Sequence, residues 1–228
     1  MFIGRIVLGG AILATALSAC TTRFSDDFEA DPLGSPPLVE PAGLPDDRVY
    51  ILDGTGEIRI TGSGPINGAQ SLRIAGPSDG GASAPNTFMY AETLSDSNQP
   101  VYAAWTGRFS GDAAARVFLW TGHYSTMVEL VFSDGQVAVN GEEIGTFEPG
   151  AEYTVLIRAT PSNDSYGVSV LGAGVSGSTT GTVLNPSVFP QSNIGMTFQL
   201  IGGGASDSYV IDAVRMSERK PPEDMPSG

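Results

Sequence analysis

The sequence is poor in the residues that build disulfide and metal frameworks, because its 228 residues include one cysteine and one histidine. A single cysteine excludes an intrachain disulfide and a multi-cysteine metal cluster, and a single histidine excludes multi-histidine metal sites. Basic residues are also scarce, since 11 Lys and Arg face 25 Asp and Glu for a net charge of −14. Nucleic-acid binding depends on basic side chains that neutralise phosphates, so we expect no nucleic-acid partner.

The sequence also lacks helical periodicity. No stretch repeats apolar residues at i, i+3, i+4 and i+7 over three turns, whereas apolar and polar residues alternate with a period of two between Gly, Pro, Asn and Asp. With 30 Gly, 16 Pro and 16% charged residues, long surface helices are disfavoured. The 41% of hydrophobic residues suffice for one sizeable core. The sequence therefore predicts one all-β domain.

The N-terminus has the layout of a secretory signal. Arg5 is followed by the apolar run Ile6–Leu17, which is shorter than the roughly 20 residues of a membrane span. The tetrapeptide Leu17–Cys20 resembles the lipobox of bacterial lipoproteins. This resemblance implies that residues 1–19 are removed and that Cys20 carries the lipid. An ordinary secretory peptide, or an anchor helix with Cys20 present by chance, is the alternative.

The lipidated residue lies close to the first predicted strand, which begins at Phe24. Residues 20–23 form a tether that reaches about 15 Å. We therefore expect the domain to sit against its membrane, held by two or three acyl chains such as palmitate. Thr21, rather than Asp, follows the cysteine. For a Gram-negative cell, the resemblance then implies that the protein passes to the outer membrane of the cell envelope.

Alternation is clearest from Arg116 to Ser133, which predicts a hairpin with Val117, Leu119 and Val128 on its apolar face. Further strands are predicted at 57–61, 70–75, 87–92, 101–109, 137–139, 153–159, 166–171, 194–201 and 208–217. Three segments between them are predicted to lack strands: the proline-rich Ala30–Asp47, the Gly/Ser/Thr-rich Gly172–Gly181, expected to be a mobile loop, and residues 218–228, expected to be a disordered tail.

Three segments carry a resemblance to a known family. These are Phe24–Glu29, the strand pair Tyr153–Val170, and the closing Tyr209–Arg215. Together they resemble the concanavalin A-like lectin/glucanase jelly rolls. The resemblance implies a two-sheet antiparallel sandwich over residues 24–217, with the first and last strands side by side. The superfamily includes lectins, glycan hydrolases, lyases and structural modules, so the fold leaves the function open.

A glycan site requires flat aromatic faces for pyranose rings and planar polar groups for hydroxyls. Trp120 shares the polar face of the predicted hairpin with Arg116 and Glu129. Further candidates from nearby strands are Gln199, Tyr102 and Trp105, although Trp105 alternates with Val101, Ala103 and Phe109 as a buried residue would. We predict that Trp120 stacks on a sugar while Arg116, Glu129 and Gln199 form hydrogen bonds. The alternative is that Arg116 and Glu129 are a cross-strand pair that keeps the sheet soluble.

Acidic residues lie near both ends of the predicted domain. If the first and last strands pair, Asp27, Glu29 and Asp212 approach one another, and three close carboxylates favour a hard cation. We therefore predict a structural calcium on these side chains. The alternative is that Asp26, Asp27 and Glu29 discourage intermolecular strand pairing.

Catalytic patterns are weak in this sequence. The Glu-x-Asp-x-x-Glu pattern of glycosidases of this fold is absent, and Glu142–Glu143 point to opposite faces of a strand. A lyase-type site could use His123, Tyr124 and Arg116, or His123 is only a turn residue. The leading hypothesis is a lipid-anchored, non-catalytic glycan-binding protein; the alternatives are a glycan hydrolase or lyase, and an assembly lipoprotein that binds another envelope protein.

Overall fold

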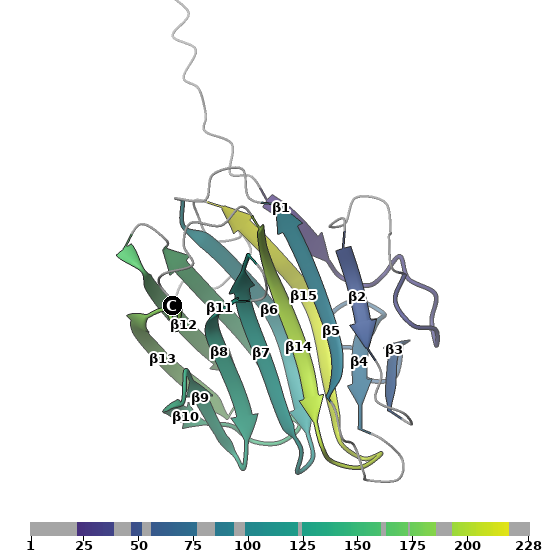
Figure 1. Ribbon diagram of the computed structural model, residues 1–228. Coiled ribbons are helices and arrows are strands. Elements are labelled where there is room, and N and C mark those ends of the chain that lie inside the picture. Colours follow the sequence, from purple (N-terminus) through teal and green to yellow (C-terminus); the bar gives the residue numbers. More distant parts are fainter. Residues whose placement is uncertain are drawn as a thin grey trace, which may run out of the picture.

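The computed structural model describes residues 22–38, 47–51, 56–76, 85–93, 99–122, 125–160, 163–172, 174–185 and 193–218. These residues form two antiparallel sheets that stack face to face (Figure 1). Within the described ranges, no helix is long and apolar enough to cross a membrane. The all-β sandwich expected from the alternation is thus confirmed.

The first sheet, sheet A, is built around a long C-terminal strand. Its strands in spatial order are β13 (Val175–Thr182), β12 (Ser165–Gly172), β11 (Glu152–Thr160), β6 (Val101–Ser110), β15 (Ser208–Glu218), β4 (Ser71–Ala75) and β3 (Glu57–Thr61), with β1 (Thr22–Asp26) also paired to β15. Pairing between β1 and β15 confirms that the first and last strands lie side by side.

The second sheet, sheet B, contains the predicted hairpin. Its strands in spatial order are β10 (Glu142–Thr146), β9 (Gln136–Val139), β8 (Ser125–Ser133), β7 (Ala114–Thr121), β14 (Asn193–Ile201), β5 (Asn86–Thr93) and β2 (Asp47–Ile51). The hairpin pairs Val117 with Leu130 and Leu119 with Val128, as its apolar face predicts.

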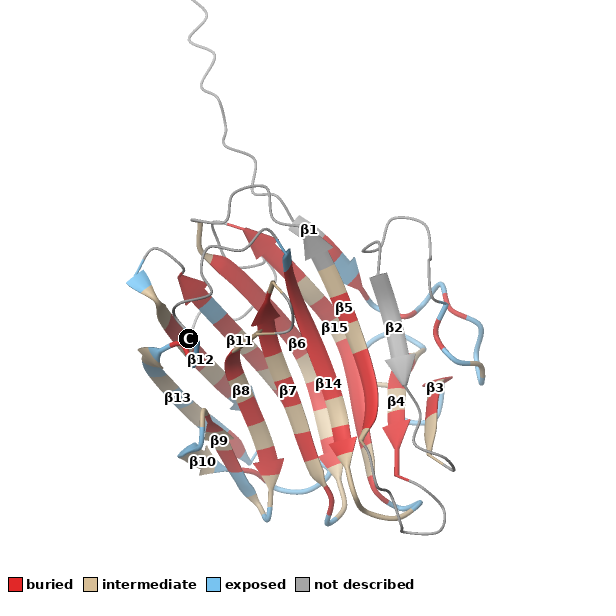
Figure 2. Cartoon of the chain, viewed as in Figure 1, coloured by how far each residue is buried: buried red, intermediate tan, exposed pale blue. Residues whose placement is uncertain are grey.

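The core lies between the sheets. Buried residues alternate along much of β7 and β11, whereas β6 and β14 each contain a run of five buried residues (Figure 2). Trp105 is fully buried, and its indole N–H donates a hydrogen bond to the Tyr209 hydroxyl at 2.9 Å. The Phe198 ring meets the Trp105 ring edge-on at 5.3 Å and lies 6.4 Å from the Tyr90 ring. These aromatic contacts join residues from both sheets, so they determine how the sheets stack.

Three sequence predictions about strand limits are wrong. The segment 172–181, expected to be a mobile loop, forms most of β13, which pairs with β12 along its whole length. Its Gly, Ser and Thr residues give little apolar alternation, so the pairing depends on backbone hydrogen bonds. The first strand begins at Thr22, ahead of Phe24, and the last extends through the buried Glu218, which was assigned to the tail.

Glycines allow one edge of sheet A to approach one edge of sheet B. A Cβ on Gly145 of β10 would lie 2.6 Å from the Ser176 carbonyl oxygen, and a Cβ on Gly177 of β13 would lie 2.6 Å from the Ile144 carbonyl oxygen. Real Cβ atoms do not approach backbone oxygens this closely. The two backbones therefore come together only because both positions are glycine.

A polar contact links β1 of sheet A to β5 of sheet B. The Tyr90 hydroxyl donates a 2.5 Å hydrogen bond to Asp26 Oδ2, and Asp26 Oδ1 accepts the backbone N–H of Phe28 at 3.0 Å. Both side chains are buried. A buried carboxylate needs such donors, because its desolvation is otherwise costly.

We predict that Tyr90→Phe lowers the free energy of unfolding by about 1–3 kcal/mol, because the buried carboxylate of Asp26 loses a donor. Urea denaturation of the variant and the parent protein measures this difference. Thr182→Ala, at an exposed position of β13, is the control and should change stability by less than about 0.5 kcal/mol. A loss no larger than that of the control would contradict the role of this contact.

Candidate functional site

The predicted stacking residue, Trp120, lies on the outward face of sheet B but is only 4% exposed. A Cβ on Gly195 would lie 2.0 Å from the indole, so the ring packs directly over this glycine. The indole N–H donates a 2.9 Å hydrogen bond to Thr197 Oγ1. The prediction that Trp120 offers an open face to a sugar is therefore wrong, because the ring is already covered and its donor is engaged.

The polar residues predicted to accompany Trp120 do lie together on sheet B. Arg116 pairs across the strands with Gln199, and its Nε lies 3.7 Å from Glu129 Oε1. Gln199 donates a 3.2 Å hydrogen bond to Thr87 Oγ1. Tyr102, in contrast, belongs to β6 of sheet A. The alternative site around His123 lies outside the described residues.

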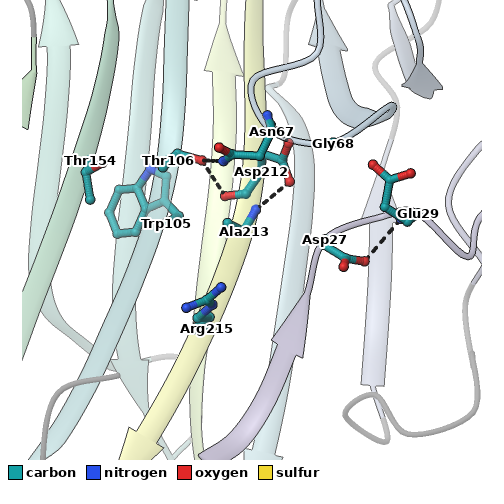
Figure 3. A pocket seen from close by; sticks show the side chains of 10 residues that line it. All are labelled: Asp27, Glu29, Asn67, Gly68, Trp105, Thr106, Thr154, Asp212, Ala213 and Arg215. Atoms are coloured by element: carbon teal, nitrogen blue, oxygen red, sulfur yellow. Dashed lines mark hydrogen bonds between the residues drawn. The ribbon is translucent and has the colours of Figure 1, made fainter. Parts of the chain in front are cut away.

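A pocket of about 390 Å³ lies on the outward face of sheet A, and we call it the Asp212 pocket. Its lining comes from β6, β11, β15, the segment after β1 and the loop around Asn67 (Figure 3). Asp27, Glu29 and Asp212, which the sequence analysis grouped, all line it. Pairing of β1 with β15 is what brings these distant residues to one place.

A bulge in β15 gives the Asp212 pocket its mixed charge. The register with β6 shifts between Asp212 and Arg215, and Ala213 adopts a φ of 49°. The core-facing residues are accordingly Tyr209 and Ile211 before the bulge and Val214 after it. Asp212 and Arg215 would point to opposite faces of a regular strand, whereas the bulge allows both to line the pocket.

Three donors hold the Asp212 carboxylate. Oδ2 accepts the backbone N–H of Asn67 at 2.9 Å and the Ser71 hydroxyl at 2.8 Å, and Oδ1 accepts the N–H of Ala213 at 2.6 Å. Burial raises the pKa of Asp212 above its ordinary value, and these hydrogen bonds oppose the rise. The negative charge of Asp27 raises the pKa further. The hydrogen bonds thus offset only part of the free-energy cost of burying the charged form of Asp212.

Glu29 is held in a similar way, and this bears on the predicted calcium. Its Oε1 accepts the backbone N–H groups of Ala69 at 2.7 Å and Gln70 at 2.9 Å. Calcium requires six to eight oxygen ligands, and these N–H donors already occupy the lone pairs of Glu29 Oε1. Across the described ranges, no three Asp, Glu, His or Cys side chains are grouped to hold a metal ion. The residues of this pocket therefore do not fit a calcium ion.

A second hollow of about 530 Å³ continues across sheet A from β6 to β13, and we call it the Arg158 pocket. Thr154 in the first pocket and Leu156 in the second are successive outward residues of β11, so the two hollows adjoin. The exposed Arg158 guanidinium lies over the Tyr102 ring, 6.0 Å from its centroid. The opposite wall carries hydroxyls from Ser169, Ser178 and Thr180.

The sequence analysis did not identify Arg158 or Arg215 as site residues. Arg158 alternates with buried apolar residues of β11, which indicates only that it points outward. Simple alternation from Ile211 places Arg215 on the core side, and the bulge reverses this. What marks Arg158 as a site residue is its position opposite Tyr102. This relation follows from the pairing of β6 with β11 and cannot be read from the sequence alone.

Comparisons with known proteins place the fold. No family model and no curated protein sequence matches the chain. Among solved structures, an endo-beta-1,4-glucuronan lyase from the fungus Trichoderma reesei is similar with a TM-score of 0.56 at 11% identity, covering 89% of this chain and 100% of that one. The lectin UEA-II complexed with galactose gives 0.53 at 11% identity over 88% and 100%.

A third similar structure is arcelin-5, a lectin-like defense protein from Phaseolus vulgaris, with a TM-score of 0.53 at 14% identity over 86% of this chain and 96% of that one. These similarities confirm the concanavalin A-like jelly roll that the sequence resemblance implied. Identities this low show the fold alone, because the same fold serves unrelated activities.

We predict that Asp212→Asn changes how stability depends on pH. An acid with a higher pKa in the folded state binds its proton more tightly there, so the free energy of unfolding falls as pH rises from the unfolded value of 3.8 through the raised folded value. Asn does not titrate, so the variant lacks this loss. Its free energy of unfolding should therefore rise relative to that of the parent protein as pH increases through this interval.

Urea denaturation of both proteins at several pH values measures the difference, and circular dichroism confirms that the variant keeps its strands. A stability difference that is the same at every pH would contradict the raised pKa of Asp212.

Proposed function

We propose that the protein is a lipid-anchored cell-envelope protein whose jelly roll binds a glycan, without catalysis, on the outward face of sheet A. The observation that carries this proposal is the Arg158 pocket. Tyr102 is 8% exposed, so the surface open to a sugar is the guanidinium plane above its ring and the hydroxyls of Ser169 and Ser178 opposite. Planar polar groups beside a shallow hollow suit the hydroxyls of a saccharide.

The strand register supports a site that accommodates a chain of sugars. Arg158 pairs with Gly167, and Gly167 pairs with Thr180. Gly167 therefore leaves a low point between a guanidinium and a hydroxyl, and the Asp212 pocket lies next to this hollow along β11. The printed names of two similar structures also refer to carbohydrates, a lectin complexed with galactose and a glucuronan lyase.

The lipid anchor is supported by the position of Cys20 in the sequence. The lipobox-like Leu17–Cys20 ends two residues before Thr22, which is already paired with Ser217 in sheet A. One residue, Thr21, separates the proposed lipidated cysteine from β1. A domain tethered in this way remains close to its membrane, which in our proposal is the outer membrane of a bacterial envelope.

We predict that Ser178→Trp blocks glycan binding. Ser178 is exposed on the outermost strand of sheet A, so the indole fills the Arg158 pocket without disturbing the core. A panel of immobilised envelope and plant glycans, tested with the purified protein in detergent, should show at least about a tenfold loss of affinity.

Thr146→Trp is the matched control, because Thr146 is exposed on the outermost strand of sheet B. This variant should bind as the parent protein does. Equal binding by the parent protein and the Ser178 variant, or failure of the parent to bind any glycan, would overturn the proposed site.

We predict that acylation depends on Cys20. When the protein is expressed in a bacterial host, radiolabelled palmitate should enter the parent protein, and Cys20→Ala should abolish the label and release the chain from the membrane fraction, because Cys20 is the sole thiol. Ser18→Thr, two residues before the cysteine, tests whether processing requires a small side chain at this position. Label that persists in the Cys20 variant would contradict lipidation at this residue.

A second candidate function, hydrolysis of a glycan, is favoured by one observation in the Asp212 pocket. Two carboxylates, Asp27 and Asp212, share this pocket, and burial raises the pKa of Asp212, with a smaller contribution from the charge of Asp27. A carboxyl group whose pKa is raised by burial, with a second carboxylate nearby, is typical of acid/base catalysis. Release of reducing ends from a glycan by the parent protein, lost in Asp212→Asn, would establish an enzyme and displace the non-catalytic proposal.

A further inference from the structure

One row of paired residues crosses sheet A from β1 to the Arg158 pocket, and we call it the Thr22 row. Its members lie opposite one another on β1, β15, β6, β11, β12 and β13. In that order they are Thr22, Ser217, Tyr102, Arg158, Gly167 and Thr180. Neighbouring strands are about 4.8 Å apart, so three spacings place the Cα atoms of Thr22 and Arg158 about 14 Å apart.

The Thr22 row lies at one end of sheet A. Tyr102 is the second residue of β6, Ser217 is the last but one of β15, and Arg158 is two residues from the end of β11. At about 3.3 Å per residue, the row is within about 7 Å of these strand ends. Cys20 precedes Thr22 by two residues, a reach of about 7 Å. In the proposed lipid-anchored protein, an acyl chain on Cys20 therefore holds this end of sheet A beside the membrane.

Arg158 brings a positive charge to this end of the sheet. Its side chain is exposed and lies over the Tyr102 ring, and within the described part of the chain no carboxylate lies within 4.0 Å of it. A cation over an aromatic face is held in place but keeps its charge. Its planar donors match the oxygens of a phosphate in two parallel hydrogen bonds.

Other arginines of sheet A are engaged elsewhere. Three of them lie in one row through Val210, and they are Arg59, Arg73 and Arg108. The first two contact Glu57 at 2.9 and 3.3 Å, and the third contacts Glu152 at 3.2 Å. Their row is six residues along β6 from Tyr102, or about 20 Å. Arg215 lines the acidic Asp212 pocket. Arg158 is therefore the arginine that combines an uncompensated charge with a place near the anchor.

Hydroxyl groups lie beside this guanidinium in the Arg158 pocket of about 530 Å³. Thr180 belongs to the Thr22 row, and Ser169 and Ser178 pair with each other in the next outward row. Ser169 is a diagonal neighbour of Arg158, at about 7–8 Å, a distance that one phosphate-linked ring spans. Among the described residues that line this pocket, none is acidic. The pocket thus offers one site for an anion and several hydrogen-bonding groups next to it.

Building on the proposed lipid anchor and glycan site, we propose that the Arg158 pocket binds the headgroup of a lipid in the protein's own membrane, a hydroxyl-bearing ring linked through a phosphate. Arg158 binds the phosphate, and Ser169, Ser178 and Thr180 bind the ring hydroxyls. The net charge of −14 repels an anionic surface at long range. The anchor offsets this repulsion, because it keeps the pocket beside the headgroups at an effective concentration on the order of millimolar, where a weak contact suffices. The bound headgroup then fixes the orientation of the domain on the membrane.

The first test measures affinity of the purified, lipid-anchored protein in detergent for three deacylated headgroups. Glycerophosphoinositol carries a phosphate and a ring, glycerophosphoglycerol carries only the phosphate, and galactosylglycerol carries only the ring. The parent protein should bind glycerophosphoinositol at least about tenfold more tightly than either of the others. Arg158→Gln should lose about tenfold in affinity for glycerophosphoinositol and none for galactosylglycerol, and Arg158→Lys should lose less because it keeps the charge. Arg116→Gln, on the opposite sheet, is the control and should bind as the parent does.

The second test asks whether the headgroup is that of the membrane. Thr182 is the exposed last residue of β13, beyond Thr180 at the anchored end. Once Cys20 carries its lipid, Thr182→Cys supplies the sole free thiol. A membrane-impermeant maleimide should label it at least about threefold more slowly in vesicles of phosphatidylcholine with an equal amount of phosphatidylinositol than in the same vesicles with phosphatidylglycerol. Addition of Arg158→Gln should remove this difference, and Thr146→Cys on sheet B should label at the same rate in both.

Equal affinity for glycerophosphoinositol and galactosylglycerol, or unchanged binding by Arg158→Gln, would overturn recognition of the phosphate. Equal labelling of Thr182→Cys in the two kinds of vesicle would overturn the membrane lipid as the ligand. If Ser178→Trp nevertheless abolishes binding to a neutral glycan, the proposed glycan site stands and this inference alone fails.

Discussion

The site depends on one irregular strand. β15 pairs with β6, β4 and β1, so any change in its geometry reaches the centre of sheet A. The bulge at Ala213 shifts its alternation by one residue while both halves still bury apolar side chains against the core. Asp212 and Arg215 therefore reach the same outward pocket, which gives a hollow with both signs of charge from a single strand.

Buried carboxylates recur around this strand, and each is held by donors from a different part of the chain. Asp26, next to β15 on β1, accepts the Tyr90 hydroxyl from sheet B. Asp212 accepts groups from the loop around Asn67 and from β4. Such contacts cost stability when a partner is lost, but when satisfied they order the segments that line the pocket. The donors to Asp212, together with the Ala69 and Gln70 N–H groups that hold Glu29, explain why the acidic cluster does not fit calcium.

The proposed glycan surface lies on the opposite sheet from the one suggested by the sequence. Trp120 shares a face with Arg116 and Glu129, as alternation predicts, yet the ring packs over Gly195 and is nearly inaccessible. Face assignment follows from periodicity, whereas accessibility depends on which neighbour lacks a Cβ. Conversely, Tyr102 and Arg158 are 56 residues apart in sequence, and only the pairing of β6 with β11 brings them together.

The sequence by itself determined the class of fold and most strands, because alternation and turn residues are local properties. The adjacency of the first and last strands was implied only by the resemblance to the concanavalin A-like jelly rolls. It also placed Asp27, Glu29 and Asp212 near one another, since that followed from one pairing. Tertiary structure alone decided the strand character of 175–182, the shifted face of Arg215, and the covering of Trp120. Each of these depends on the backbone of a distant segment, and no local pattern encodes such a contact.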